Sequence, residues 1–154
     1  MIPFFRKYFG KIYIPIIWTL FIGILLTLPG SVLPSETKFY IPQFDKLVHM
    51  SMFGGFVFLW NLYLSNRSMN KGNTAGNNLA NPARSNSAIN IAKLLRSFFL
   101  IFILAVAYGV SSEYIQGCCI PLRDFDLADI IADMSGAGLA YGISNLFLLP
   151  VDKG

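Results

Sequence analysis

Ionisable side chains recur at intervals of three and four residues in this chain. Asp45 and His49 are four residues apart, and Asp126, Asp129 and Asp133 follow one another at intervals of three and four. In a helix these intervals place side chains on one face. Carboxylates beside an imidazole suit proton transfer or the binding of a cation. The pattern therefore predicts a polar site that forms where the helices carrying these residues meet.

Other polar residues lie near the predicted ends of the same helices. Glu113 and Gln116 are three residues apart, Lys46 precedes His49 by three, and Arg123 lies in a short turn. We expect a shallow hydrated pocket lined by Asp45, His49, Glu113, Arg123, Asp129 and Asp133. The full set of candidate ligand-binding residues is Asp45, Lys46, His49, Glu113, Gln116, Arg123, Asp126, Asp129 and Asp133.

Several of these residues also have an ordinary structural explanation. Asp126 is suited to cap the helix that follows it, and Asp129 to stabilise its first turn through the helix dipole. Lys46 is suited to snorkel to a membrane interface, and Gln116 to decorate that interface. His49 is suited to a hydrogen bond inside the helix bundle. Capping does not exclude a second role for the same carboxylate.

The carboxylates of this predicted site outnumber its cations. Glu113 and Asp133 also lie within apolar runs, where a carboxylate costs several kcal/mol unless it is paired or neutralised. Such an excess requires a protonated acid, a bound cation or a cationic ligand, because crowded carboxylates raise each other's pKa. A divalent cation at the acidic cluster is one way to meet this need.

Four apolar runs carry the candidate residues. The chain has 154 residues, of which 55% are hydrophobic and only 13% are charged, a composition typical of membrane proteins. A cytoplasmic, flexible loop is expected at 65–93, which is rich in Asn and Ser. The prediction is an all-α, single-domain bundle over 1–154 with four transmembrane helices. The runs are Ile12–Leu28, Leu47–Leu64, Leu94–Gln116 and Leu127–Leu149.

The basic residues indicate how this bundle is oriented. Nine of the twelve lysines and arginines fall in the N-terminal segment, the 65–96 region and the C-terminal tail. Because basic residues favour the cytoplasmic side, both termini are predicted to be cytoplasmic. The first run is expected to be retained, since no small-x-small cleavage motif follows it before Pro34. Topology thus accounts for the net charge of +4, and no nucleic-acid partner is expected.

Small residues in the helices predict close packing between them. Their four-residue spacing lets helix backbones approach one another, and two adjacent glycines in the second run would act similarly. The predicted close-packing positions are Ala132, Gly136, Ala140, Gly138, Gly142, Gly54 and Gly55.

The two cysteines of the chain are neighbours, Cys118 and Cys119. Adjacent cysteines rarely form a disulfide with each other, and the spacing resembles no metal-binding motif. We interpret them as two small apolar residues near an interface, with an interchain disulfide as the alternative.

The sequence resembles the VanZ-like family in four short motifs that occur in order. The resemblance covers about 12–146 except the loop at 65–93, which looks like an insertion, and Asp133 stands where relatives often have Asn. It implies a protein of the bacterial cytoplasmic (inner) membrane and envelope. The family takes its name from a protein linked to resistance against the glycopeptide teicoplanin. The motifs are Phe44-Asp45-Lys46-x-x-His49, Tyr108-Gly109 with Ser112-Glu113-x-x-Gln116, Arg123-x-x-Asp126-x-x-Asp129, and Ala132-Asp133-x-x-Gly136.

Two functions fit these features best. In the first, the protein binds or modulates a lipid headgroup, a lipid-linked cell-wall precursor or a glycopeptide. In the second, it is a membrane-embedded enzyme acting on such precursors, with His49 or Glu113 as general acid or base. A transmembrane ion pathway is disfavoured, because no acid lies in the inner half of any predicted span. Besides membrane lipids, a second membrane protein is a candidate partner, because four thin helices bury little surface alone.

Overall fold

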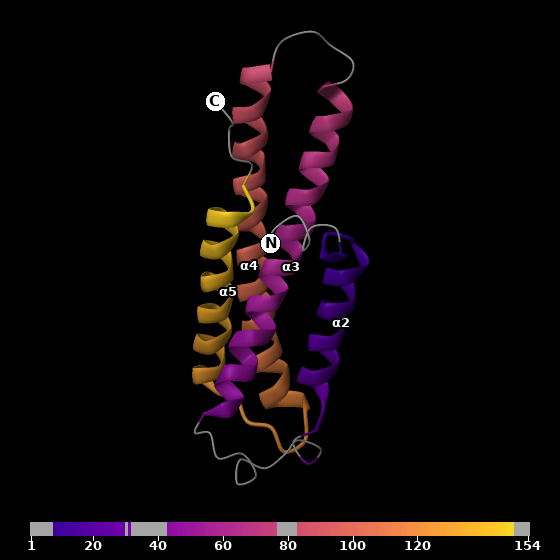
Figure 1. Cartoon of the computed structure of the whole chain (residues 1–154). Coiled ribbons are helices and arrows are strands. Elements are labelled where there is room, and N and C mark those ends of the chain that lie inside the picture. Colours follow the sequence, from indigo (N-terminus) through magenta and orange to yellow (C-terminus); the bar gives the residue numbers. More distant parts are fainter. Residues whose placement is uncertain (1–7, 30, 32–42, 77–82, 150–154) are drawn as a thin grey trace.

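Four long helices form the part of the chain that the structure describes. The computed structural model describes residues 8–29, 31, 43–76 and 83–149, and within 71–76 and 83–90 it describes the backbone alone. Across these ranges there is no strand, which confirms the all-α prediction. Figure 1 shows the helices side by side along one axis, with α3 and α4 continuing past α2 and α5. They are α2 (Tyr13–Thr27), α3 (Phe44–Gly76), α4 (Ala83–Cys119) and α5 (Leu127–Phe147).

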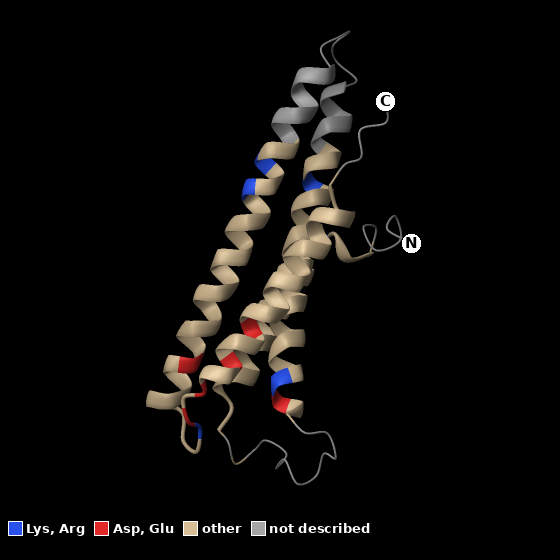
Figure 2. Ribbon diagram, turned by 90° about the vertical axis from the view of Figure 1, so that its left-hand side faces the viewer, with Lys and Arg blue, Asp and Glu red and all other residues tan. Residues whose placement is uncertain are grey.

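The chain runs up and down through the bundle, so alternate helices point the same way. α3 and α5 begin at one end, where α2 and α4 finish (Figure 1). We call this the acidic end, because the described acidic residues lie there (Figure 2). The ends of three separate helices therefore bring their polar residues together, as the sequence predicted.

The core of the bundle forms around α3. This helix contacts each of the other three, and its most extensive interface is with α5. Large side chains such as Phe53 and Val57 are fully buried there, beside small ones such as Ala137. The core therefore pairs bulky residues of α3 with small residues of α5, which is how a narrow bundle fills its interior.

Two glycines set how closely α3 and α5 approach. A Cβ added at Gly136 would overlap the carbonyl group of Met50, and one at Gly54 would lie 3.3 Å from the Gly136 carbonyl oxygen. The predicted close packing is confirmed for this pair. It is wrong for Gly142, whose Cβ would meet nothing within 4 Å, because that position faces outward.

Two indole groups attach α2 to α3. Trp18 donates from Nε1 to the Met52 carbonyl oxygen at 3.0 Å, and Trp60 donates to Thr19 Oγ at 3.1 Å. The Trp18 ring lies where a side chain at Gly55 would be, at 2.8 Å from an added Cβ. Gly55 thus provides room for the aromatic ring that holds α2 in place.

Two of the helices are long and apolar enough to cross a membrane. Within α3 the segment is Phe44–Asn70, and within α4 it is Ile91–Cys119. Only 39% and 28% of their most apolar stretches are buried, whereas the core helix of a soluble protein is mostly buried. α2 has 15 residues and rises about 22 Å. That the chain crosses the membrane four times, with both termini in the cytoplasm, remains a prediction.

The predicted loop at 65–93 is wrong in its extent. α3 continues to Gly76 and α4 begins at Ala83, so most of this region is helical. Ser and Asn lower helix propensity by only a few tenths of a kcal/mol each, and an existing helix adds residues without a new nucleation cost. The polar composition of this region therefore did not mark where either helix ends.

Candidate functional site

Lys46 joins the starts of α3 and α5. Its Nζ forms ion pairs with Asp126 and Asp129, and lies 3.8 Å from Asp45. The Lys46 side chain is 25% exposed, so it turns toward these acids rather than snorkelling freely into a membrane interface. Asp129 is 7% exposed, and the ion pair balances a carboxylate that would otherwise be buried without a counter-charge.

Asp126 caps α5, as the sequence predicted. One oxygen of its carboxylate accepts a hydrogen bond from the Ala128 amide at 2.8 Å, while the other faces Lys46. The Lys46 ammonium, and after it the Ala128 amide, hold the pKa of Asp126 below its ordinary value. Capping and ion pairing thus use different oxygens of one carboxylate.

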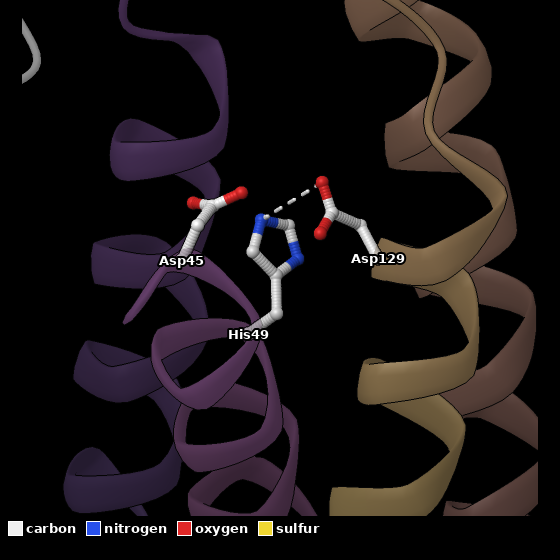
Figure 3. Close-up of side chains that lie close together, drawn as sticks. All are labelled: Asp45, His49 and Asp129. Carbon is white, nitrogen blue, oxygen red and sulfur yellow. Dashed lines mark ion pairs between the residues drawn. The ribbon is translucent and has the colours of Figure 1, made fainter. Parts of the chain in front are cut away.

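A buried pair lies one helical turn deeper. His49 Nδ1 is 3.0 Å from Asp133 Oδ1, and both side chains are almost completely buried. His49 Nε2 lies 3.9 Å from Asp129 Oδ2. Figure 3 shows the imidazole between the carboxylates of Asp45 and Asp129. The spacing of the acids therefore does place them around the only histidine of the chain, as predicted.

Glu113 reaches the same end of the bundle from α4. Its side chain is fully buried, and its Oε2 accepts a hydrogen bond from the Asp126 amide at 3.2 Å. The carboxyl group also interacts electrostatically with Asp129, His49 and Asp133. Glu113 and Asp133 thus share the bundle interior, which is the arrangement that a common site requires.

Several buried polar atoms at the acidic end have no hydrogen-bond partner among the described residues. Those of α4 are Glu113 Oε1 and Gln116 Nε2, and that of α5 is Asp133 Oδ2. Gln116 is 1% exposed, so the prediction that it decorates an interface is wrong; its position on the face of Glu113 turns it inward. Buried polar groups are normally hydrogen-bonded, so this group has unused capacity for a ligand.

Arg123 is set apart from the acids that the sequence grouped with it. It lies in the turn between α4 and α5, where its backbone amide bonds to the Ile120 carbonyl oxygen at 3.3 Å. Within the described residues it forms no ion pair, and its Nε lacks a hydrogen-bond partner. Lys46, not Arg123, therefore supplies the positive charge in contact with the acids.

Two features of the polar interior were missed by the sequence analysis. Gly109 provides space for Asp133, because an added Cβ would lie 2.9 Å from Asp133 Oδ2. Asn61 is fully buried in the middle of α3, and neither of its amide atoms has a partner among the described residues. An amide inside an apolar run was a visible signal for Asn61. Gly109 belongs to one of the family-like motifs, but its contact with Asp133 depends on how α4 packs against α5.

Comparison with known protein families, with curated proteins and with solved structures finds no match for this chain. The class of protein is accordingly defined by the fold and the site alone. It is an all-helical bundle in which two helices are long enough to cross a membrane, with buried ionisable residues collected at one end.

Proposed function

We propose that this chain is a VanZ-like protein of the bacterial cytoplasmic membrane that binds an amphiphilic envelope ligand at its acidic end. The observation that carries the proposal is the set of buried polar atoms without partners on Glu113, Gln116 and Asp133. A lipid headgroup, a lipid-linked cell-wall precursor or a glycopeptide would supply the missing hydrogen bonds.

Placement in a membrane is supported by the outer surface of the bundle. Ile17, Leu20 and Ile24 of α2 and Leu139 of α5 are each about 60% exposed. Soluble monomers rarely expose apolar side chains in such continuous bands. Lipid tails would cover these bands at no desolvation cost.

Charge favours a ligand with an amino group. Lys46 already forms ion pairs with Asp126 and Asp129, so it is poorly suited to bind a phosphate or carboxylate of a ligand. The acids, by contrast, exceed the cations in contact with them. An ammonium group hydrogen-bonded to Glu113 Oε1 would reduce this imbalance, and hydrogen bonds to charged groups are the stronger kind.

Binding can be tested with the full chain in lipid nanodiscs by native mass spectrometry. The probes are phosphatidylethanolamine, phosphatidylglycerol and teicoplanin. Glu113→Gln keeps the shape and the contact with the Asp126 amide, yet it should weaken binding of an amine-bearing probe about tenfold or more. Asp124→Asn, an exposed acid of the neighbouring turn, is the matched control. Equal retention of all probes by both variants would reject the proposal.

The second candidate function is a membrane-embedded enzyme acting on lipid-linked precursors. The hydrogen-bonded pair of His49 and Asp133 favours it, because a carboxylate that orients an imidazole is a common feature of acid–base catalysis. His49→Ala and Glu113→Gln would then abolish turnover of a lipid-linked precursor. A protein that only binds has no turnover to lose, so this assay separates the two functions.

A further inference from the structure

Three side chains converge at the acidic end with the donor atoms that a metal ion requires. One ligand atom each of Asp45, His49 and Asp129 lies within 4.8 Å of the others. His49 Nε2 and Asp129 Oδ2 are 3.9 Å apart (Figure 3). Metal–ligand bonds of about 2.0–2.2 Å place neighbouring donors roughly 3–4 Å from one another. The His49–Asp129 distance falls within this spacing, and the side chain of Asp45 is 45% exposed.

The imidazole of His49 is oriented for this role. A metal at Nε2 requires the ring proton on Nδ1, and Nδ1 lies 3.0 Å from the Asp133 carboxylate that would accept it. Nε2, which lies 3.9 Å from Asp129 Oδ2, then carries the lone pair. A carboxylate behind a metal-binding histidine fixes the ring and raises its basicity, as in many metal sites. Asp133 is therefore a positioning residue.

Lys46 does not use the oxygen that the metal would need. Its ammonium pairs with Asp129 Oδ1, whereas Oδ2 of the same carboxylate faces His49. Among the described residues, Lys46 is the one lysine in contact with the carboxylates of Asp45, Asp126 and Asp129. Asp133, which is paired with His49, adds a further carboxylate. A divalent cation would reduce the remaining negative charge.

An independent observation comes from α4. Glu113 is fully buried, its Oε1 has no partner among the described residues, and its carboxyl group interacts electrostatically with His49 and Asp129. A buried carboxylate oxygen at this end of the bundle is unfavourable without a cation or a hydrogen-bond donor.

We propose that Asp45, His49 and Asp129 bind one divalent transition-metal ion of the zinc type. An imidazole ligand favours zinc, cobalt or nickel over magnesium and calcium, which prefer oxygen donors alone. The metal site shares the acidic end with the proposed ligand site but does not depend on it. Metal binding is measured without any lipid probe, so the two proposals fail separately.

The single histidine makes the test direct. The full chain is labelled with ¹⁵N-histidine, purified with a histidine-free tag, and titrated with zinc in detergent micelles. Cys118 and Cys119 are exposed thiols at the same end, so both are replaced by Ser in every variant. Zinc should shift the Nε2 resonance of His49 with one ion bound per chain, and magnesium at equal concentration should not.

Two variants complete the experiment. Asp45→Asn, at an exposed ligand, should weaken zinc binding about tenfold or more, whereas Asp124→Asn should leave it unchanged. His49→Asn should abolish stoichiometric binding. The proposal is overturned if the imidazole resonances do not respond to saturating zinc, if magnesium shifts them equally, or if both Asp variants bind zinc alike.

Discussion

Lys46 of α3 links its helix to α5 by forming ion pairs with Asp126 and Asp129. It contributes the only ammonium in contact with Asp129 among the described residues, and Asp129 is 7% exposed. Removing one partner of a buried ion pair leaves the other charge without compensation, which costs more than the pair contributes. The stability of the α3–α5 interface therefore depends on the partly buried side chain of Lys46.

Lys46→Met should destabilise the protein, because it keeps the apolar stem and removes the charge. We expect a loss of about 1–3 kcal/mol, less than for a fully buried pair, since Lys46 is 25% exposed and Asp126 46%. Thermal unfolding in detergent measures the loss. Lys93→Met, at an exposed position, is the control and should change stability by less than about 0.5 kcal/mol. Equal effects of the two substitutions would contradict this role of Lys46.

Asp126 should make stability depend on pH in the acidic range. Its pKa is lowered in the folded state, so its contribution is complete above the ordinary pKa of aspartate and is lost as pH falls through the lower, folded value. Asp126→Asn keeps a cap but carries no charge. The difference in unfolding temperature between wild type and Asp126→Asn should therefore be largest near pH 7 and shrink below about pH 4. A difference that is constant with pH would exclude this mechanism.

At the scale of the helices, the polar residues were predictable and their partners were not. The i, i+3, i+7 spacing of Asp126, Asp129 and Asp133 identified one face of α5 from the sequence alone. The bridge from Lys46 to two of these acids depends on the rotation and register of α3 against α5, which no local pattern encodes. The loop predicted at 65–93 was too long, because the polar composition of this region did not mark the end of α3 or the start of α4.

The glycines of α5 allow the α3–α5 packing to be tested with a matched pair. Gly136→Ala would place a Cβ against the Met50 carbonyl group and should cost about 1–3 kcal/mol, because backbone cannot move aside as a side chain can. Gly142→Ala meets open space and should stabilise α5 by about 0.5–1 kcal/mol through helix propensity. Both are measured by thermal unfolding in detergent. Similar effects at the two positions would show that α5 does not pack on α3 through Gly136.

At the scale of the whole molecule, charge is distributed unevenly along the bundle. Figure 2 shows the acidic residues at the end where α3 begins, where Lys46 and Arg123 also lie, and the other described lysine and arginine residues of α3 and α4 toward the opposite end. Basic residues favour the cytoplasmic side of a membrane, whereas acids have little influence on orientation. The orientation proposed for the chain therefore rests on its basic residues, and the acidic end is expected to face outward.

The orientation can be measured with the cysteines that the chain already has. Cys118 and Cys119 are exposed at the end of α4, at the acidic end. A membrane-impermeant maleimide should label them in intact cells. In the Cys118→Ser, Cys119→Ser background, a cysteine introduced at Asn70, an exposed position near the opposite end of α3, should be labelled only after the membrane is permeabilised.

The reverse pattern would invert the topology and place the candidate site in the cytoplasm. Labelling of both positions in intact cells would contradict a membrane-spanning α3, because one helix cannot cross the bilayer and leave both ends outside.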